Sequence, residues 1–265
     1  MRSTLLALLA LSLISLSLLP GITQAATLYN AGADLLTNES LNNPSELSSI
    51  NFSVPEWSYG YRGTTLGTSL TLFTPADHVN GTYQGFADVN SICCGALPNV
   101  IVNTGAPAGS PDGTVATGDI TMHPDGNATF PNSIEEKPVV RFTASISGAY
   151  DLNALFEDVD DCCGGTGQGV DVHVVLNGVS IFDAQISREG SDALPDGTTF
   201  ATTLDLISGD ILDFVVGTNG LLYGDNTRFN ATLELLPPAP EPSSIVLLGL
   251  GTLALVRTGR RRRAA

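Results

Sequence analysis

The chain has 265 residues, including 28 glycines and 15 prolines, and its formal net charge is −16 at pH 7. Six of its 11 basic and one of its 27 acidic residues lie outside residues 27–236, which leaves 5 basic against 26 acidic residues there, a net charge of −21. A field of this sign repels phosphate backbones and anionic lipids, so nucleic-acid binding is disfavoured. Neutral glycans and divalent cations remain as ligand classes.

Residues 1–26 are expected to form a secretory signal peptide. An apolar run from Leu5 to Leu19 follows Met1-Arg2, and the small-residue sequence ending in Ala25 and Ala26 comes next. This order is typical of a signal peptide that is cut after Ala25 or Ala26. An uncleaved anchor helix is the alternative, but the apolar run is short and a cleavage-type site follows it. Residues 27–236 are long enough for one domain with its own core.

The first half of this domain, residues 27–129, is rich in Gly, Pro and Asn and is expected to supply edge strands and long loops. Trp57, Tyr59 and Tyr61 share one face if their segment is a strand. Exposed rings in such a row would stack on sugars, whereas buried rings would belong to the core, which is the favoured interpretation. Tyr223, in the Gly-rich segment 217–225, is a further candidate for glycan binding.

All four cysteines occur as two adjacent pairs, Cys93-Cys94 and Cys162-Cys163, each in loop-like sequence before a glycine. Adjacent cysteines rarely bridge each other, because the small ring strains the peptide. Two disulfides between the loops are therefore expected in an oxidising compartment. A four-thiolate zinc site is the alternative, although its cysteines are normally spaced by two or more residues.

The second half of the domain alternates apolar and polar residues with the period of a strand. Val170, Val172 and Val174 share one face, and Asn177-Gly178 then supplies the positive backbone angles of a tight hairpin turn. The same alternation recurs at residues 140–146, 150–156, 179–186, 200–206, 212–216 and 229–235. Short strands at this spacing, without a convincing helical stripe, predict an all-β domain, an antiparallel β-sandwich with a jelly-roll-like topology.

An acidic run beside Cys162 offers Asp158, Asp160 and Asp161 as ligands for calcium, which takes six to eight oxygen ligands. Their spacing does not match the helix-loop-helix calcium motif. A solvated acidic loop is the alternative. The sequence requires no cofactor, and calcium is the metal that it favours.

Little in the sequence points to catalysis. His78, His123 and His173 are the only histidines, and no nucleophile elbow, metalloprotease helix or phosphate loop accompanies them. His173 lies on the polar face of its strand, so a solvated surface histidine is expected. A secreted glycan-active hydrolase that uses a carboxylate pair is the alternative to a non-catalytic domain, but so many acidic residues make no single pair informative.

The C-terminal segment has three parts: a Pro-rich stalk (237–244), an apolar segment (245–257) and an Arg-rich tail (258–265). The prolines cannot join a strand ladder, so the domain is expected to end near Leu236. The apolar segment is short beside the roughly 20 residues of a usual membrane span, and a buried core helix is the alternative. Dense arginines remain on the cytoplasmic side of a membrane, which favours a transmembrane helix.

Pro240, Glu241 and Pro242, the apolar segment, and Arg260, Arg261, Arg262 and Arg263 together resemble the PEP-CTERM sorting signal of Gram-negative bacteria. The resemblance covers about a tenth of the chain. It implies a transient inner-membrane anchor and an exosortase partner that cuts near Pro-Glu-Pro. The released protein would reach the cell surface or the exopolysaccharide matrix.

A second, weaker resemblance spans about residues 50–235. Five segments carry it: residues 57–61, 122–124, 139–143, 172–178 and 208–217. Together they are similar to a module of secreted bacterial proteins, and that module is similar to carbohydrate-binding jelly rolls. This resemblance supports the fold more than a ligand. The sequence as a whole therefore predicts an exported, non-catalytic β-sandwich with a structural or glycan-contacting role.

Overall fold

A computed structural model gives the fold of the chain. It describes residues 26–37, 56–73, 77–80, 83–88, 97–105, 108–110, 113–126, 135–159, 169–188, 194–220 and 225–238. Thr27–Leu236 forms one compact unit, and the two terminal segments form another.

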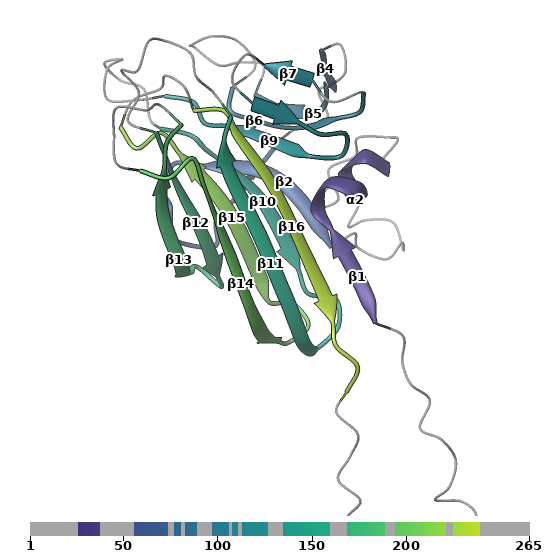
Figure 1. The fold of residues 1–265 in the computed structure, drawn as a ribbon. Coiled ribbons are helices and arrows are strands. Elements are labelled where there is room, and N and C mark those ends of the chain that lie inside the picture. The colour runs from purple at the N-terminus through teal and green to yellow at the C-terminus, as the bar shows by residue number, and fades with distance from the viewer. Residues whose placement is uncertain are drawn as a thin grey trace, which may run out of the picture. The chain divides into compact units, whose positions relative to one another are not determined.

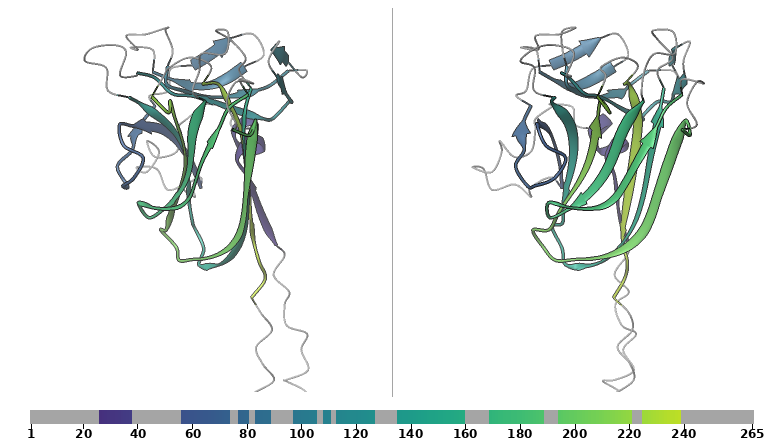
Figure 2. Two further views of the ribbon diagram at one scale, coloured as in Figure 1. Left: turned by 60° about the vertical axis from the view of Figure 1, so that its left-hand side comes forward. Right: turned by 90° about the vertical axis from the view of Figure 1, so that its left-hand side faces the viewer.

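Two antiparallel sheets, packed face to face, make up most of the unit Thr27–Leu236 (Figures 1 and 2). The larger, eight-stranded sheet has seven strands in one row: β14 (Gly197–Leu206), β11 (Gly148–Asp158), β16 (Thr227–Leu235), β9 (Ile120–His123), β6 (Asn99–Asn103), β5 (Tyr83–Ala87) and β4 (Asp77–Asn80). Its eighth strand, β1 (Thr27–Asn30), pairs with the C-terminal half of β16, and β9 pairs with the N-terminal part of β16 on the same side.

The smaller, six-stranded sheet faces it with the order β13 (Val179–Ile186), β12 (Val170–Leu176), β15 (Ile211–Gly217), β10 (Lys137–Thr143), β2 (Trp57–Arg62) and β3 (Thr71–Leu72). A separate hairpin joins β7 (Ala108–Ser110) and β8 (Gly113–Val115). The expected β-sandwich is therefore confirmed. The first half of the domain contributes more than edges and loops, since β2, β6 and β9 are inner strands.

Turn residues with left-handed backbone angles set the hairpins that the sequence predicted. Asn177 (φ 50°) and Gly178 (φ 84°) connect β12 to β13, and Gly209 (φ 96°) lies in the turn before β15. Glycine and asparagine adopt these angles at low cost, which fixes the two-residue connection and the register next to the turn. A register shift between Val174 and Val175 then places His173 directly opposite Asp183.

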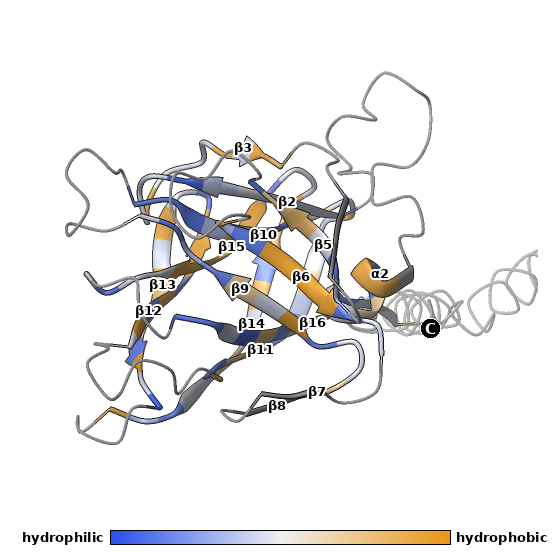
Figure 3. Cartoon of the chain, turned by 90° about the horizontal axis from the view of Figure 1, so that it is seen from above, coloured by the Kyte–Doolittle hydropathy of each residue, from blue (hydrophilic) through white to orange (hydrophobic). Residues whose placement is uncertain are grey.

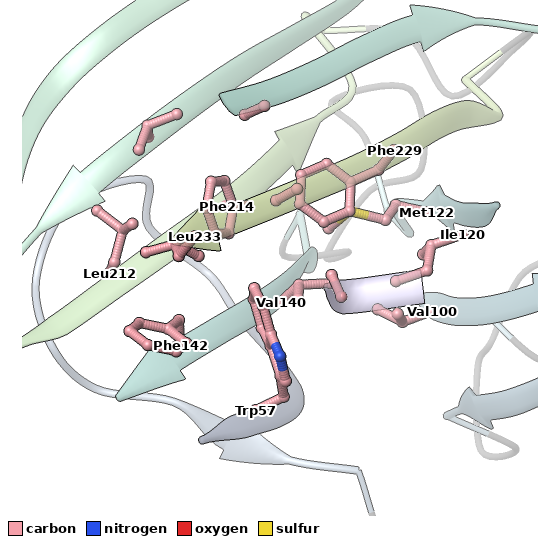
Figure 4. Packing of buried hydrophobic residues seen from close by; sticks show 14 of the residues in the cluster. Trp57, Val100, Ile120, Met122, Val140, Phe142, Leu212, Phe214, Phe229 and Leu233 are labelled. Atoms are coloured by element: carbon pink, nitrogen blue, oxygen red, sulfur yellow. The ribbon is translucent and has the colours of Figure 1, made fainter. Parts of the chain in front are cut away.

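The core is formed by the inward-facing residues of both sheets and is rich in aromatic rings (Figure 4). Hydrophobic residues recur along the strands of both sheets (orange in Figure 3). Phe214 of β15 and Phe229 of β16 meet with ring centroids 5.0 Å apart, and Trp57 lies 5.2 Å from Phe142. Aromatic pairs in this range add to the stability gained from burial alone. The predicted row Tyr150, Leu152, Ala154 and Phe156 is buried as expected, whereas Ile146 follows the end of β10 and is exposed.

One short helix, α2 (Ala31–Thr37), was not predicted because seven residues give no helical stripe. Asn30 caps it: its side-chain oxygen accepts the Ala33 N–H at 2.9 Å, and Asp34 accepts the Asn30 N–H at 3.0 Å. Asp34 also accepts a hydrogen bond from the Trp57 indole at 2.8 Å. The helix is thereby attached to β2.

Candidate functional site

A hollow of about 650 Å³ lies on the outer face of the six-stranded sheet, and we call it the acidic hollow. Its lining combines three carboxylates, two cationic or titratable side chains, two amides and three small or apolar residues: Glu135, Asp171, Asp183, Lys137, His173, Gln185, Asn219, Ala184, Leu194 and Gly220. Strands β10, β12 and β13 and the ends of three loops supply these residues. Its volume falls in the range of ordinary ligand pockets.

His173 occupies the centre of a three-residue hydrogen-bonded cluster. Its Nε2 lies 2.7 Å from Asp171 Oδ2, and its Nδ1 lies 2.5 Å from Asp183 Oδ1. The strand period places Asp171 and His173 on one face of β12, and the register shift between Val174 and Val175 places Asp183 of β13 opposite His173. The expectation of a solvated histidine was wrong, because the His173 side chain is only 13% exposed between its two carboxylates.

Lys137 reaches the same cluster from β10. Its Nζ lies 2.5 Å from Glu135 Oε1 and 3.5 Å from Asp171 Oδ2. Gly217 of β15 lies between the two strands, and a Cβ there would be 2.2 Å from Lys137 Nζ and 2.4 Å from Asp171 Oδ1. The missing side chain of Gly217 is what allows the lysine and the aspartate to approach each other.

Backbone and amide groups complete the hydrogen bonds of the acidic hollow. Asn219 N–H donates to Asp171 Oδ1 at 2.9 Å, and Thr218 N–H donates to Glu135 Oε1 at 2.8 Å. The Gln185 amide donates to Asn219 Oδ1 at 2.8 Å. The carboxylates are thus held by the strands and by the turn after β15, so the site is largely preformed.

These contacts shift the titration of the central residues. Burial lowers the pKa of His173, but its hydrogen bonds to Asp171 and Asp183 and their negative charges outweigh burial, so the pKa lies above its ordinary value of 6.5. Burial raises the pKa of Asp171, but the hydrogen bond with His173, the charge of Lys137 and the Asn219 N–H bring it well below 3.8. Hydrogen bonds with His173 and Ser180 lower the pKa of Asp183. The cluster therefore favours a protonated histidine between two ionised aspartates.

The acidic hollow suits hydrogen bonding better than nucleophilic chemistry. Beside the histidine cluster, Ser180 Oγ donates to Asp183 Oδ1 at 2.7 Å, so its proton points at a carboxylate instead of a base. Within the described ranges, no group of three or more His, Cys, Asp or Glu side chains is arranged to hold a metal ion. Hydrogen-bond donors and acceptors thus converge in the acidic hollow.

The predicted aromatic row does not form a glycan platform. Trp57 and Tyr59 are 4% and 2% exposed and belong to the core, so neither ring offers a face to a sugar. Burial also raises the pKa of Tyr59 far above its usual value, with the charge of Asp34 adding to the effect. Tyr61 is half-buried and packs 5.3 Å from Phe73, centroid to centroid. The favoured interpretation, a core row, describes Trp57 and Tyr59 correctly.

Most of the other predicted site residues lie outside the described residues. This applies to Ala25, Cys93, Cys94, Cys162, Cys163, Asp160, Asp161, Tyr223, Pro240, Glu241, Pro242 and Arg260 to Arg263. Ala26 immediately precedes β1. Asp158 is fully buried at the end of β11, where its Oδ2 accepts the Arg188 N–H at 3.0 Å.

The residues of the acidic hollow were largely missed because they come from separate strands. One signal was available: Lys137 is the only lysine of the chain, and it follows two glutamates directly before an apolar strand. In a domain with 5 basic and 26 acidic residues, a basic side chain at the start of a strand is expected to pair with acidic side chains.

Residues 238–263 match the PEP-CTERM protein-sorting motif. The chain therefore carries a sorting signal that indicates an exported protein with transient membrane attachment and implies an exosortase partner. In the part of the chain that the structure describes, no helix is both long and apolar enough to cross a membrane. The apolar segment 245–257 lies outside that part.

No protein of curated function matches the sequence. Solved structures with some similarity include rabbit GITRL, with a TM-score of 0.27, 13% identity, and coverage of 37% of this chain and 73% of that chain. The CBM51 of a Clostridium perfringens GH95 protein, in complex with methyl-galactose, has a TM-score of 0.30 and 17% identity, covering 49% of this chain and 80% of that chain. A family 35 carbohydrate-binding module from Clostridium thermocellum has a TM-score of 0.23 and 13% identity, covering 43% and 86%. Likenesses of this size support no conclusion about activity or ligand.

Proposed function

We propose that this chain is an exported, non-catalytic protein of the cell surface or the exopolysaccharide matrix. Residues 1–26 are removed as a signal peptide, and residues 245–257 hold the chain in the inner membrane with the Arg-rich tail in the cytoplasm. An exosortase then cuts near Pro240 to Pro242 and releases the domain. The observation that carries this proposal is the match of residues 238–263 to the PEP-CTERM protein-sorting motif.

The order of the strands supports a jelly-roll topology for the passenger. The four strands β14, β11, β16 and β9 are neighbours in one sheet, and β13, β12, β15 and β10 are neighbours in the other. Successive strands from β9 to β16 alternate between the sheets except at the β12–β13 hairpin. This is the connectivity of two Greek keys wrapped into a double sheet.

We further propose that the acidic hollow is where the passenger contacts glycan hydroxyls. A sugar hydroxyl both donates and accepts hydrogen bonds, and the hollow offers fixed acceptors at Asp183 and Glu135 and donors at Lys137 and Gln185. Groups held by strands and by their own hydrogen bonds lose little freedom when a ligand binds. The core positions of Trp57 and Tyr59 leave the hollow as the better supported site.

A hydrolase at this site is the alternative, but two of the three carboxylates that line the hollow do not suit the role of its acid. A glycosidase needs one carboxylic acid whose pKa is raised so that it can protonate the leaving group. In the hollow the pKa values of Asp171 and Asp183 are lowered. Glu136, whose pKa is raised by burial and by the charges of Asp88 and Asp125, does not line the hollow. Binding is therefore the function that we propose.

The sorting proposal is tested by intact mass and fractionation of the protein from its own host, with Arg260 to Arg263 unchanged or all replaced by Ala. We expect the unchanged protein outside the inner membrane, shortened near Pro240 and without its arginines. The Ala variant should remain full length. Recovery of the unchanged protein at full length in the inner membrane would refute release by an exosortase.

The glycan proposal is tested separately, by retention of the full chain on the exopolysaccharide of its host. Gln185→Ala and Asp183→Asn should each weaken retention about tenfold, as expected when one hydrogen bond to a polar or charged group is lost. Asn153→Ala, on the outer face of the other sheet, is the matched control. Equal retention of all variants would exclude the acidic hollow as the binding site and leave the sorting result untouched.

A further inference from the structure

The outer strands of the two large sheets differ in how well they are protected against further pairing. Among the described residues, β3 is only two residues long and β4 four residues long. β13 has a register shift in its pairing with β12 and an exposed charge at Asp183. Short edges, irregular pairing and charges are the devices by which proteins prevent edge-to-edge association.

β14 is neither short nor irregularly paired, and it carries a single charge near its end. It is ten residues long, and its pairing with β11 continues without a shift from Gly197 to Leu206. It contains no proline and no basic residue, and Asp205 near its end is its only charge. Four threonines and Phe200 give it a composition that favours strand pairing. No described strand pairs with its outer edge, so a row of backbone donors and acceptors about 33 Å long is available there.

The two edges β13 and β14 lie on the same side of the sandwich. Phe182 of β13 and Phe200 of β14 stack with ring centroids 4.8 Å apart and only partly fill the opening between the sheets. Phe200 and Leu204 are half-buried members of the core periphery. A strand added beside β14 would cover apolar surface as well as pair the backbone.

We infer that β14 is an interface that pairs antiparallel with β14 of a second copy of this chain. β14 is a place where two copies of this acidic chain, with a net charge of −16, can meet without like-charge repulsion, because Gly197–Leu204 carries no charge. In an antiparallel pair centred on Ala201, Thr199 lies opposite Thr203 and Asp205 lies opposite Gly197. No like charges meet, and the inner and outer faces of the sheet continue from one copy to the next. This inference does not depend on the proposed function.

The first test compares two lysine substitutions in the full chain, purified in mild detergent and followed by sedimentation across a dilution series. Ala201→Lys places like charges opposite each other at the centre of the pair. Asn153→Lys is the matched control, because Asn153 is paired with Ala201 in the sheet and lies on the same exposed face one strand further in. We expect dimers of the wild type and of Asn153→Lys, and loss of the dimer in Ala201→Lys.

The second test does not require Ala201→Lys to fold well. In the inferred pair, Ala201→Cys brings two Cα atoms to about 5 Å, within disulfide range. Asn153→Cys leaves its two Cα atoms about 14 Å apart, which is three strand spacings and too far for a disulfide. Both variants retain the four native cysteines, so the difference between them is informative. A monomeric wild type, a dimeric Ala201→Lys variant, or equal cross-linking of the two cysteine variants would overturn the inference.

Discussion

Arg141 and Asp213 occupy directly paired positions on β10 and β15 and form a bidentate ion pair. The Arg141 Nε–H donates to Asp213 Oδ1 at 2.7 Å, and its Nη2–H donates to Oδ2 at 2.9 Å. Arg62 of β2 also donates to Asp213 Oδ2, at 2.8 Å, through Nη1. Its Nη1 and Nη2 groups also donate to the carbonyls of Gly67 and Thr65, respectively. One fully buried carboxylate thus holds two arginines, and Arg62 holds the segment after β2 against the outer face of the six-stranded sheet.

Asp213→Asn is expected to destabilise the domain by about 3–5 kcal/mol, because it leaves two buried guanidinium groups without their counter-charge. The measurement is denaturant unfolding of the full chain, followed by the fluorescence of Trp57, the only tryptophan. Glu234→Gln, on an exposed position of β16, is the control and should change stability by less than about 0.5 kcal/mol. Equal effects of the two substitutions would show that the ion cluster contributes no net stability.

The histidine cluster predicts a defined pH dependence of stability. Because the folded pKa of His173 is raised above 6.5, its contribution is complete below that pH and is lost as pH rises through the folded pKa. Because the folded pKa values of Asp171 and Asp183 are lowered below 3.8, their contribution is present above that pH and is lost as pH falls through the folded values. The cluster therefore stabilises the fold most between pH 3.8 and 6.5.

His173→Gln tests this pH dependence. The substitution removes the titrating charge, so its cost should be about 1–3 kcal/mol inside the window and should shrink as pH rises above it. The free energy of unfolding, measured at several pH values in the wild type and the variant, gives the difference curve. A difference that is independent of pH would mean that His173 contributes packing alone.

Gly217→Ala should separate Lys137 from Asp171. The added Cβ cannot remain 2.2 Å from Lys137 Nζ, so the lysine must leave its position beside Asp171. We expect a loss of about 1–3 kcal/mol from overpacking, measured by denaturant unfolding. Lys137→Met, which removes the charge and retains most of the chain length, provides the comparison. If Gly217→Ala matches the wild type in stability, the close packing across Gly217 is not required.

Trp57→Ala should act through stability and not through glycan retention. The substitution removes a core ring and its hydrogen bond to Asp34, with an expected cost of about 3–5 kcal/mol. Circular dichroism during urea unfolding measures this cost in the absence of tryptophan fluorescence. Leu66→Ala, at a residue that is 53% exposed, should have little effect. Reduced glycan retention by a Trp57→Ala protein with unchanged stability would restore the aromatic row as a binding site.

Much of the sandwich could be predicted because many of its strands have one buried apolar face and one polar face. Val170, Val172 and Val174 face the core and Asp171 and His173 do not, so the alternation in the sequence reports burial directly. The Asn177-Gly178 turn could be identified because it needs residues that adopt positive φ. The rows in β11 and β16 followed for the same reason. Helix α2 escaped prediction because its stability comes from the Asn30 cap and the contact with Trp57 rather than from a periodic apolar face.

The site was less accessible to prediction because local pattern assigns a side chain to a face but not to a partner. The alternation placed Asp213 and His173 correctly on the outer face, where polar residues are usually solvated. Both residues instead have partners on neighbouring strands. Asp213 pairs with Arg141 of β10, more than seventy residues upstream, and His173 bonds Asp183 of β13. The scarcity of basic residues was the available clue, since Arg62, Lys137, Arg141 and Arg228 all form ion pairs.

The position of β16 also affects when the domain can fold. It is the last strand of the domain in sequence, yet it lies inside its sheet, between β11 on one side and β9 and β1 on the other. During synthesis from the N-terminus, Thr227–Leu235 is the last strand of the domain to be made. Until then the strand that pairs with both β11 and β9 is missing, and the core lacks Phe229. Closure is therefore a single late event that waits for the C-terminal strand.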